Sequence, residues 1–222
     1  MVSLPKIKCQ QVNQDLQISD DNYQRISDLI FDTDPFIYPA LFGNGRVGKS
    51  NARLILPAVF QSNLDHMFSK DNLFVAYLKE TVVGIVLWHK GNLDWNSSIL
   101  LSYAKRNSVR LTPQNVAAVQ SEYVESRYSQ NESYQNESLS LINVCVAKEQ
   151  RGNGIARHML KSFIDEHRNE DMELTVLADN TPAIALYRRL GFEISKTADG
   201  FSLSSDKPKC LIMIRSKGVF EV

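Results

Sequence analysis

The most regular part of the chain runs from Leu139 to Gly191, and its hydrophobic pattern limits the available folds. Leu139–Val146 and Leu174–Leu177 are short apolar runs, which are typical of buried strands. Between these runs apolar residues recur at helical spacing, at Ile155, Ala156, Met159, Leu160, Phe163 and Ile164. Pro182–Leu190 predicts a second helix, and Gly191 fits the position just after its end. A strand, helix, strand and helix in this order predict two parallel strands joined by a crossover.

The residues before this segment predict a strand and two helices. Ile7 to Val12 predict an opening strand, and Asp20 or Asp21 can cap a helix that Pro35 and Pro39 interrupt. A loop is expected where three glycines follow, at Gly43, Gly45 and Gly48. A second helix is expected from the apolar residues Leu54, Ile55, Ala58, Val59, Leu64, Met67 and Phe68.

Two pairs of strands complete the expected sheet. Leu73–Leu78 and Val82–Trp88 are apolar at consecutive positions and are separated by a short polar turn. This pattern predicts a hairpin that is covered on both faces. Glu193–Thr197 and Cys210–Arg215 predict closing strands, with a polar loop over Ala198–Lys209.

The segment from Gly91 to Ser138 departs from this pattern. Pro113 after Thr112 is a favourable helix start, and apolar residues follow it at helical spacing. Ser129–Ser138 is almost entirely Ser, Asn, Gln and Glu, which predicts a polar loop. We therefore expect a single domain over residues 1–222, with a helix-plus-loop insertion at about residues 91–138.

Composition narrows the classes of function. Lys plus Arg and Asp plus Glu both number 25, so there is no basic excess of the kind that nucleic-acid-binding proteins carry, and no nucleic acid is expected as a partner. No stretch approaches the ~18 uninterrupted apolar residues of a membrane span, so no membrane is expected either. The cysteines Cys9, Cys145 and Cys210 lack zinc-site spacing, and Met1–Lys8 lacks a signal-peptide pattern. These features predict a cytoplasmic protein without a metal.

The turn between the first strand and its helix reads Gln150-Arg151-Gly152-Asn153-Gly154-Ile155-Ala156. The first N–H groups of a helix lack an intrahelical partner, and the helix dipole adds partial positive charge there. Two glycines let a phosphate approach the backbone closely, and Arg151 can supply a cation. The turn therefore predicts a phosphate site, although the same residues also fit a plain glycine turn.

Two sequence motifs are present, one at this turn and one on the helix after the second strand. At the turn, Arg151, Gly154 and Ala156 occupy the fixed positions of the motif Q/R-x-x-G-x-G/A. A second motif, N-x-x-A-x-x-L-Y-x-x-x-G-F, is matched by Asn180, Ala183, Leu186, Tyr187, Gly191 and Phe192. With both motifs in this order and each after a strand, Leu139 to Phe192 resembles the GNAT superfamily of acetyl-CoA-dependent N-acetyltransferases. The insertion is not part of the minimal family pattern.

The resemblance implies an α/β (α+β) GNAT acyltransferase fold. Its central sheet is mixed and mostly antiparallel, with a splayed parallel strand pair and helices on both faces. It also implies acetyl-CoA as the cosubstrate, with the pantetheine arm in the gap between the splayed strands, and no metal. The residues that the resemblance places at the cofactor are Val144, Val146, Ala147, Lys148, Arg151, Gly152, Asn153, Gly154, Ile155, Ala156, Asn180, Ala183 and Tyr187.

The resemblance further implies direct attack of a primary amine on the thioester in a ternary complex. Tyr187 would be the catalytic residue that protonates the departing thiolate, although it also fits an aromatic packed on a helix face. Asn180 would contact the cofactor arm, cap the helix at Pro182, or do both. A backbone N–H near Val146 would polarise the carbonyl. No general base is assigned, and the amine acceptor, a small molecule or a peptide, stays open; a homodimer is common for such folds.

A rival motif, from Gly43 to Ser50, satisfies the GxxxxGK[ST] pattern of nucleotide-binding P-loops letter for letter. It would place Lys49 on the terminal phosphates and Ser50 on magnesium. A P-loop must follow a buried strand, and Pro35 and Pro39 stand where a central strand cannot hold them. We therefore expect a chance match.

Two interpretations of the chemistry compete with direct transfer. The same fold without catalysis would be a regulatory module that senses acyl-CoA, against which the retained Tyr187 argues. Cys145 would be a nucleophile in the second interpretation, but strand alternation and its apolar neighbours favour an inert buried thiol. In the family, the region after the first helix often borders the acceptor pocket, where Tyr38, Phe42 and Arg46 would lie.

Overall fold

The computed structural model describes residues 6–13, 16–62, 66–91, 97–128, 138–202 and 206–218. These residues contain one seven-stranded sheet with the strand order β1-β2-β3-β4-β5-β7-β6. Its strands are β1 (Ile7–Gln11), β2 (Leu73–Leu78), β3 (Thr81–Lys90), β4 (Leu139–Val146), β5 (Met172–Leu177), β6 (Glu193–Asp199) and β7 (Lys209–Arg215). Among these neighbours β4 and β5 are parallel, and every other pair is antiparallel. The expected mixed, mostly antiparallel sheet is confirmed.

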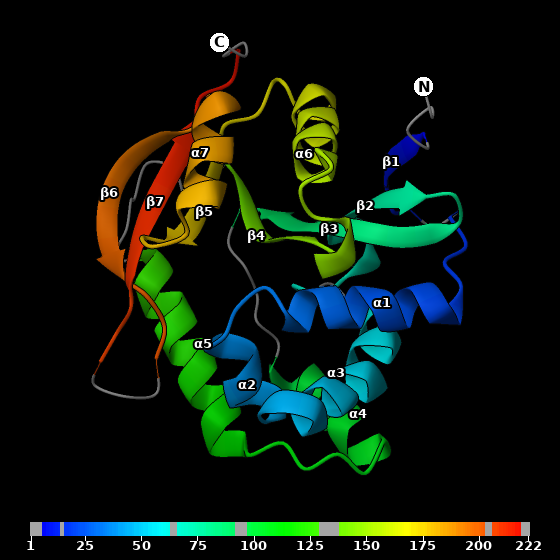
Figure 1. The fold of residues 1–222 in the computed structure, drawn as a ribbon. Coiled ribbons are helices and arrows are strands. Elements are labelled where there is room, and N and C mark those ends of the chain that lie inside the picture. The colour runs from blue at the N-terminus through cyan, green and yellow to red at the C-terminus, as the bar shows by residue number, and fades with distance from the viewer. Residues whose placement is uncertain are drawn as a thin grey trace.

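Helices lie on both sides of this sheet. They are α1 (Asp20–Phe31), α2 (Ile37–Phe42), α3 (Gly45–Phe60), α4 (Ser97–Arg106), α5 (Pro113–Tyr128), α6 (Ile155–Glu166) and α7 (Thr181–Arg189). Figure 1 shows α6 on one side of the sheet and α1 to α4 on the opposite side. The two helices predicted between Leu139 and Gly191, α6 and α7, are both present.

The central strands are covered on both faces because their side chains alternate between two apolar clusters. On β2, Leu73, Val75 and Tyr77 pack in the cluster formed with α1 to α5. Phe74 and Ala76 pack in the cluster formed with α6 and α7. Because successive strand residues point to opposite faces, a continuous apolar run needs a cover on each side. The predicted two-sided hairpin of β2 and β3 is confirmed.

The cap of α1 differs from the prediction. The hydroxyl of Ser19, and not a side chain of Asp20 or Asp21, accepts a hydrogen bond from the N–H of Asn22 at 3.3 Å. Asp20 and Asp21 lie one position further on, in the first turn of the helix. Their negative charge is favourable there because the unpaired N–H groups make the helix start electropositive.

The predicted loop at Gly43, Gly45 and Gly48 was wrong, because α3 already begins at Gly45. Gly43 ends α2 with a φ of 98°. A Cβ on Gly48 would lie 1.7 Å from the carbonyl oxygen of Gly43 and 2.9 Å from the ring of Phe31. Glycine at position 48 therefore allows the corner between α2 and α3 to close. The helix α3 ends at Phe60, so the later apolar residues of the predicted helix lie beyond it.

The described residues between 91 and 138, where the sequence predicted one helix, contain two. The helix α5 begins at Pro113, as expected, whereas α4 was missed. The buried side chains of α4 are Ile99, Leu100 and Ala104. Residues 129–137 of the predicted polar loop, and Leu64 of the predicted second helix, lie outside the described residues.

The strands β4 and β5 pair over only part of their length. Their register runs from Leu139 opposite Met172 to Leu141 opposite Leu174. Beyond these positions β4 stays paired with β3 and β5 stays paired with β7, each to its last residue. The two strands therefore part midway, and the gap opens where β4 leads to α6 and β5 leads to α7 (Figure 1).

Candidate active site

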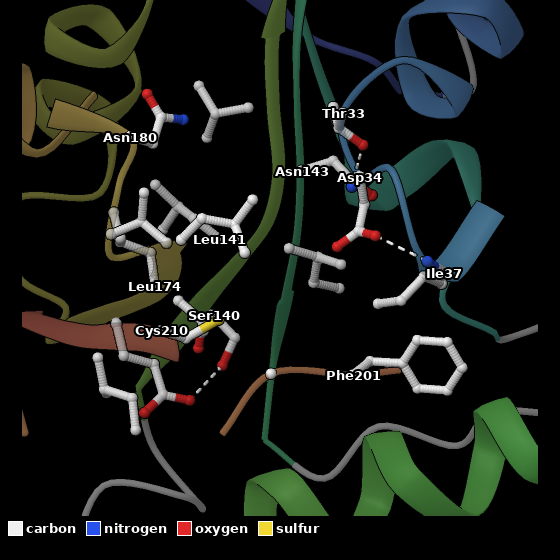
Figure 2. Close-up of a pocket in the computed structure, with 18 of the residues that line it drawn as sticks. Thr33, Asp34, Ile37, Ser140, Leu141, Asn143, Leu174, Asn180, Phe201 and Cys210 are labelled. Carbon is white, nitrogen blue, oxygen red and sulfur yellow. Dashed lines mark hydrogen bonds between the residues drawn. The ribbon is translucent and has the colours of Figure 1, made fainter. Parts of the chain in front are cut away.

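The gap between β4 and β5 holds a cavity of about 230 Å³. Its lining includes residues 140–144 of β4, residues 173–177 of β5 and residues 199–201 at the end of β6. Residues 33, 34, 37 and 38 around the start of α2 also line it, as do residues of α7 and β7. Figure 2 shows Thr33, Asp34 and Ile37 across the gap from Asn180, Leu174 and Cys210. The parting of one strand pair thus brings distant segments of the chain to one site.

The turn before α6 presents an open helix N-terminus. Gly152 and Gly154 have φ values of 80° and 74°, which only glycine adopts readily. A Cβ added at either glycine would meet no atom within 4 Å among the described residues. The N–H groups of Gly152, Asn153 and Gly154 donate to no described residue either. These amides are free to bind an anion, which the dipole of the 12-residue helix α6 favours.

Arg151 is held by the end of β4. Its Nε donates to the carbonyl oxygen of Val146 at 3.0 Å, and its Nη2 lies 4.0 Å from the Sγ of Cys145. The guanidinium therefore ties the turn to the strand that precedes it. The backbone carbonyl of Val146 is already engaged by this contact.

The other residues predicted at the cofactor lie along the same path. Val144 is half-buried and lines the cavity. Val146 and Ala147 are buried at the end of β4, and the N–H of Ala147 donates to the carbonyl of Val83 at 2.8 Å. Lys148 is exposed at the start of a short 3-10 turn. The remaining positions are the first residues of α6 and α7: Ile155 is buried, and Ala156 and Ala183 are half-buried.

Asn180 caps α7 and also faces the gap. Its Oδ1 accepts from the N–H of Ala183 at 3.3 Å, which satisfies one of the unpaired amides at the start of the helix. Figure 2 shows the Nδ2 of Asn180 turned toward the gap, where the residue lines the cavity. One amide side chain can therefore cap the helix with its oxygen and donate to a ligand with its nitrogen.

Tyr187 lies in the wall of the cavity with only 8% of its surface exposed. Its ring packs edge-on against Phe192, with centroids 5.9 Å apart. Burial raises the pKa of Tyr187 above its ordinary value, and the nearby Cys145 raises it further. The phenol is therefore protonated at neutral pH, and burial makes it a weaker acid than an exposed tyrosine.

Cys145 is buried, and burial raises the pKa of its thiol, although the charge of Arg151 opposes that rise. A thiol with a raised pKa is a weak nucleophile because the thiolate is the reactive form. This environment agrees with the inert interpretation of Cys145.

Asn143 joins β4 to the segment between α1 and α2. Its Oδ1 accepts from the hydroxyl of Tyr38 at 2.6 Å, and its Nδ2 donates to the Oγ1 of Thr33 at 2.6 Å. Tyr38 lines the cavity, as expected. Phe42, which is buried in the core, and Arg46, which is exposed on α3, are not among the described lining residues.

Asp34 is one of the lining residues that the sequence did not predict. It stands between α1 and α2, and its Oδ1 accepts from the N–H groups of Phe36 and Ile37, each at 2.7 Å. An Asp directly before a proline and a short helix predicts only a capping residue. Nothing in the local sequence indicates that this loop meets the gap between two strands more than 100 residues further on.

The P-loop pattern is part of a helical corner in the structure. The helix α2, and not a strand, precedes Gly43, and the motif is helical from Gly45 onward. Lys49 pairs with Asp32 through an Nζ–Oδ2 distance of 2.7 Å. The expectation of a chance match agrees with this geometry.

Neither a metal site nor a membrane helix is found where the structure describes the chain. Its described residues contain no group of three or more His, Cys, Asp or Glu side chains placed to hold a metal ion. No helix among them is long and apolar enough to span a membrane.

The fold and the site together define a class of protein. A sheet with one splayed parallel pair, an open helix N-terminus after the first strand of that pair, and a cavity in the gap are the features expected of the GNAT acyltransferase fold.

Comparison with known proteins identifies the family. The profile of the acetyltransferase (GNAT) family matches residues 53–192. A segment of 64 residues is 34% identical to the L-amino acid N-acetyltransferase AaaT of Escherichia coli (strain K12), covering 27% of this chain and 40% of that relative. The chain belongs to the GNAT acetyltransferase family, whose members use acetyl-CoA.

Solved structures share the fold. A structure from Corynebacterium glutamicum, described as histone acetyltransferase HPA2 and related acetyltransferase, has a TM-score of 0.58 at 18% identity. The match covers 97% of this chain and 99% of that chain. The NatC complex bound to Gag peptide and CoA has a chain with a TM-score of 0.52 at 14% identity, with 95% and 98% covered. At these identities the likeness shows the fold alone.

Proposed function

We propose that the protein transfers the acetyl group of acetyl-CoA to a primary amine by direct attack within a ternary complex. One observation carries this proposal: β4 and β5 part beside a helix start whose amides are unpaired among the described residues. The gap accepts a narrow pantetheine arm, and the helix start accepts the diphosphate. The two features meet where β4 leads into α6.

The proposed cofactor path follows the chain from β4 to α6. The diphosphate would bind the amides between Arg151 and Ala156, and the arm would run along β4 from Val144 to Lys148. Asn180 would donate to the arm through its Nδ2. The thioester would then lie in the cavity, beside the hydroxyl of Tyr187.

Tyr187 would act on the leaving group. When the amine attacks, the C–S bond breaks and the thiolate needs a proton. The buried phenol is protonated at the start of the reaction and would donate its proton to the developing thiolate, which is a much stronger base than the thioester sulfur. Its position on α7, in the wall of the cavity, supports this role.

We further propose that the acceptor is a small amine. The cavity of about 230 Å³ is below the ~300–1,000 Å³ that is typical of drug-sized ligands. The curated relative is named as an L-amino acid N-acetyltransferase, which supports a free amino acid as the first candidate. A peptide with a free N-terminus is the alternative, since a structural neighbour is bound to a peptide.

The test mixes the protein with acetyl-CoA and a panel of amines and follows the release of free thiol. The panel holds free L-amino acids, n-butylamine, putrescine and short peptides with a free N-terminus. Amine-dependent thiol release with matching acetylated product supports the proposal. Tight binding of acetyl-CoA without turnover on the whole panel would instead support a regulatory module that senses acyl-CoA.

The remaining expectations stay proposals. We propose a single domain over residues 1–222, a cytoplasmic location, a homodimer, and no nucleic acid or membrane as a partner. The free thiols of Cys9, Cys145 and Cys210 agree with a reducing compartment. Size-exclusion chromatography with light scattering measures the oligomeric state.

A further inference from the structure

The carboxylate of Asp34 is held in one orientation by the backbone. Two N–H groups, those of Phe36 and Ile37, donate to its Oδ1 at 2.7 Å. The Oδ2 accepts from no described residue. Figure 2 shows Oδ1 turned toward Ile37 and the second oxygen turned away from it, toward the central strands of the sheet. Asp34 is one of the residues that line the cavity.

The other carboxylates that line the cavity are held by side chains instead of backbone N–H groups. Glu173 accepts from the hydroxyl of Ser140 at 2.7 Å, and Asp199 pairs with Lys209 at 2.5 Å. The described lining of the cavity contains no Lys, Arg or His. A cavity with carboxylates and no described cation in its wall attracts a positively charged ligand.

The position of Asp34 suits the proposed reaction. It lies on the α1–α2 side of the gap, while Asn180 and Tyr187 belong to the side formed by β5 and α7. A thioester held in the gap would therefore have the leaving-group donor on one side and this carboxylate on the other. An acceptor amine must enter from the side that the cofactor does not fill.

We propose that Asp34 binds the ammonium group of the acceptor through its Oδ2 and takes the proton that this group must lose before it attacks. This inference rests on the proposed function and supplies the general base that the sequence does not show. It also favours acceptors that are cationic in solution and have a compact end that fits the gap.

Protons and bonds balance over the whole reaction. The ammonium gives its first proton to Asp34, directly or through one water, and the free nitrogen lone pair attacks the thioester carbon. A C–N bond forms and the C–S bond breaks, while the nitrogen loses a second proton and the sulfur gains one from Tyr187. Tyr187 regains its proton from the nitrogen side, and Asp34 releases its proton to solvent.

The environment of Asp34 fits this task. Burial raises the pKa of Asp34, and the hydrogen bonds from Ile37 and Phe36 oppose that rise. A carboxylate with a raised pKa is a better base than an ordinary one. The other titratable groups that line the cavity are those of Tyr38, Glu173, Tyr187, Asp199 and Cys210. A pH profile must therefore be compared with that of a variant that lacks only Asp34.

The test uses Asp34→Asn, because the amide oxygen of asparagine can accept the same two N–H groups while its NH₂ replaces the free carboxylate oxygen. The matched control is Asp32→Asn, two residues away, where Asp32 pairs with Lys49 outside the cavity. Thermal melting of both variants checks the fold. Two probes are compared: n-butylamine, which is protonated at neutral pH, and hydroxylamine, which is not.

Two measurements are made on each protein. Calorimetry titrates n-butylamine into the protein saturated with CoA, and a thiol assay measures kcat/KM for both probes. For Asp34→Asn we expect n-butylamine binding to weaken at least ~10-fold and its kcat/KM to fall about 100-fold. The hydroxylamine rate should change only a few-fold, because no proton has to be removed first. Asp32→Asn should match the parent.

The outcomes separate the two proposals. If the parent turns over and Asp34→Asn shows the same turnover and the same n-butylamine binding, the role of Asp34 is overturned and acetyl transfer is kept. Binding of n-butylamine that depends on Asp34, without any transfer, keeps the ammonium site and overturns the transferase. An equal loss with both probes shows that Asp34 removes no proton and overturns its role as base. If the parent neither binds n-butylamine nor transfers an acetyl group, both proposals are overturned.

Discussion

Replacing Gly154 perturbs the turn before α6 without any clash in the surrounding protein. The residue has a φ of 74°, and a Cβ built on it meets no described atom within 4 Å. The cost of Gly154→Ala is therefore the left-handed backbone alone, about 1–2 kcal/mol. For a chain of 222 residues this lowers Tm by about 2–8 °C.

Gly154→Glu shares that backbone cost and adds a carboxylate where the diphosphate is proposed to bind. Two unit charges about 4 Å apart repel by ~4 kcal/mol near a protein surface, and salt screens part of this. We expect ~2 kcal/mol, or about a 30-fold weaker Kd for acetyl-CoA than in the alanine variant. Titration calorimetry of both variants measures the difference. Equal affinities in the two variants would refute the placement of the diphosphate at this turn.

Three further results are expected. Tyr187→Phe should lower kcat about 100-fold and leave the Kd for acetyl-CoA within about two-fold; equal kcat would remove the phenol from the reaction. Cys145 should resist iodoacetamide at neutral pH because burial raises its pKa, and Cys145→Ser should retain turnover; rapid alkylation followed by mass spectrometry would contradict this. Burial also raises the pKa of Asp34, so the folded state binds more protons than the unfolded state and stability falls as pH rises through that window. The gain in Tm of Asp34→Asn over the parent should therefore be larger near about pH 7 than near about pH 4. The same difference in Tm at both pH values would show that the charge of Asp34 does not destabilise the fold.

The corner at Gly48 shows how a motif can match without its chemistry. The letters of a P-loop are present, but Gly43 and Gly48 each have a local structural reason. Gly43 ends α2 with a positive φ, and Gly48 lies where a Cβ would overlap the carbonyl of Gly43. A phosphate loop needs a strand before it, and the prolines that precede this motif already argued against one.

The sequence by itself determined the elements from Leu139 to Arg215 and their order. Apolar periodicity separates strands from helices because it depends on residues only a few positions apart. A helix between the strands Leu139–Val146 and Leu174–Leu177 also predicts that the two strands are parallel. The anion-binding turn was predictable for the same reason, since its glycines and the helix start are adjacent in the chain.

Only the tertiary structure decided where β4 and β5 part and which distant residues meet in the gap. The contact of Tyr38 with Asn143 joins residues 105 positions apart, and it brings the loop of Asp34 to the cavity. The side chain of Arg151 is likewise engaged by the end of β4, which its place in the motif did not indicate. Such contacts follow from how two packed layers fit together, and a local pattern carries no information about that fit.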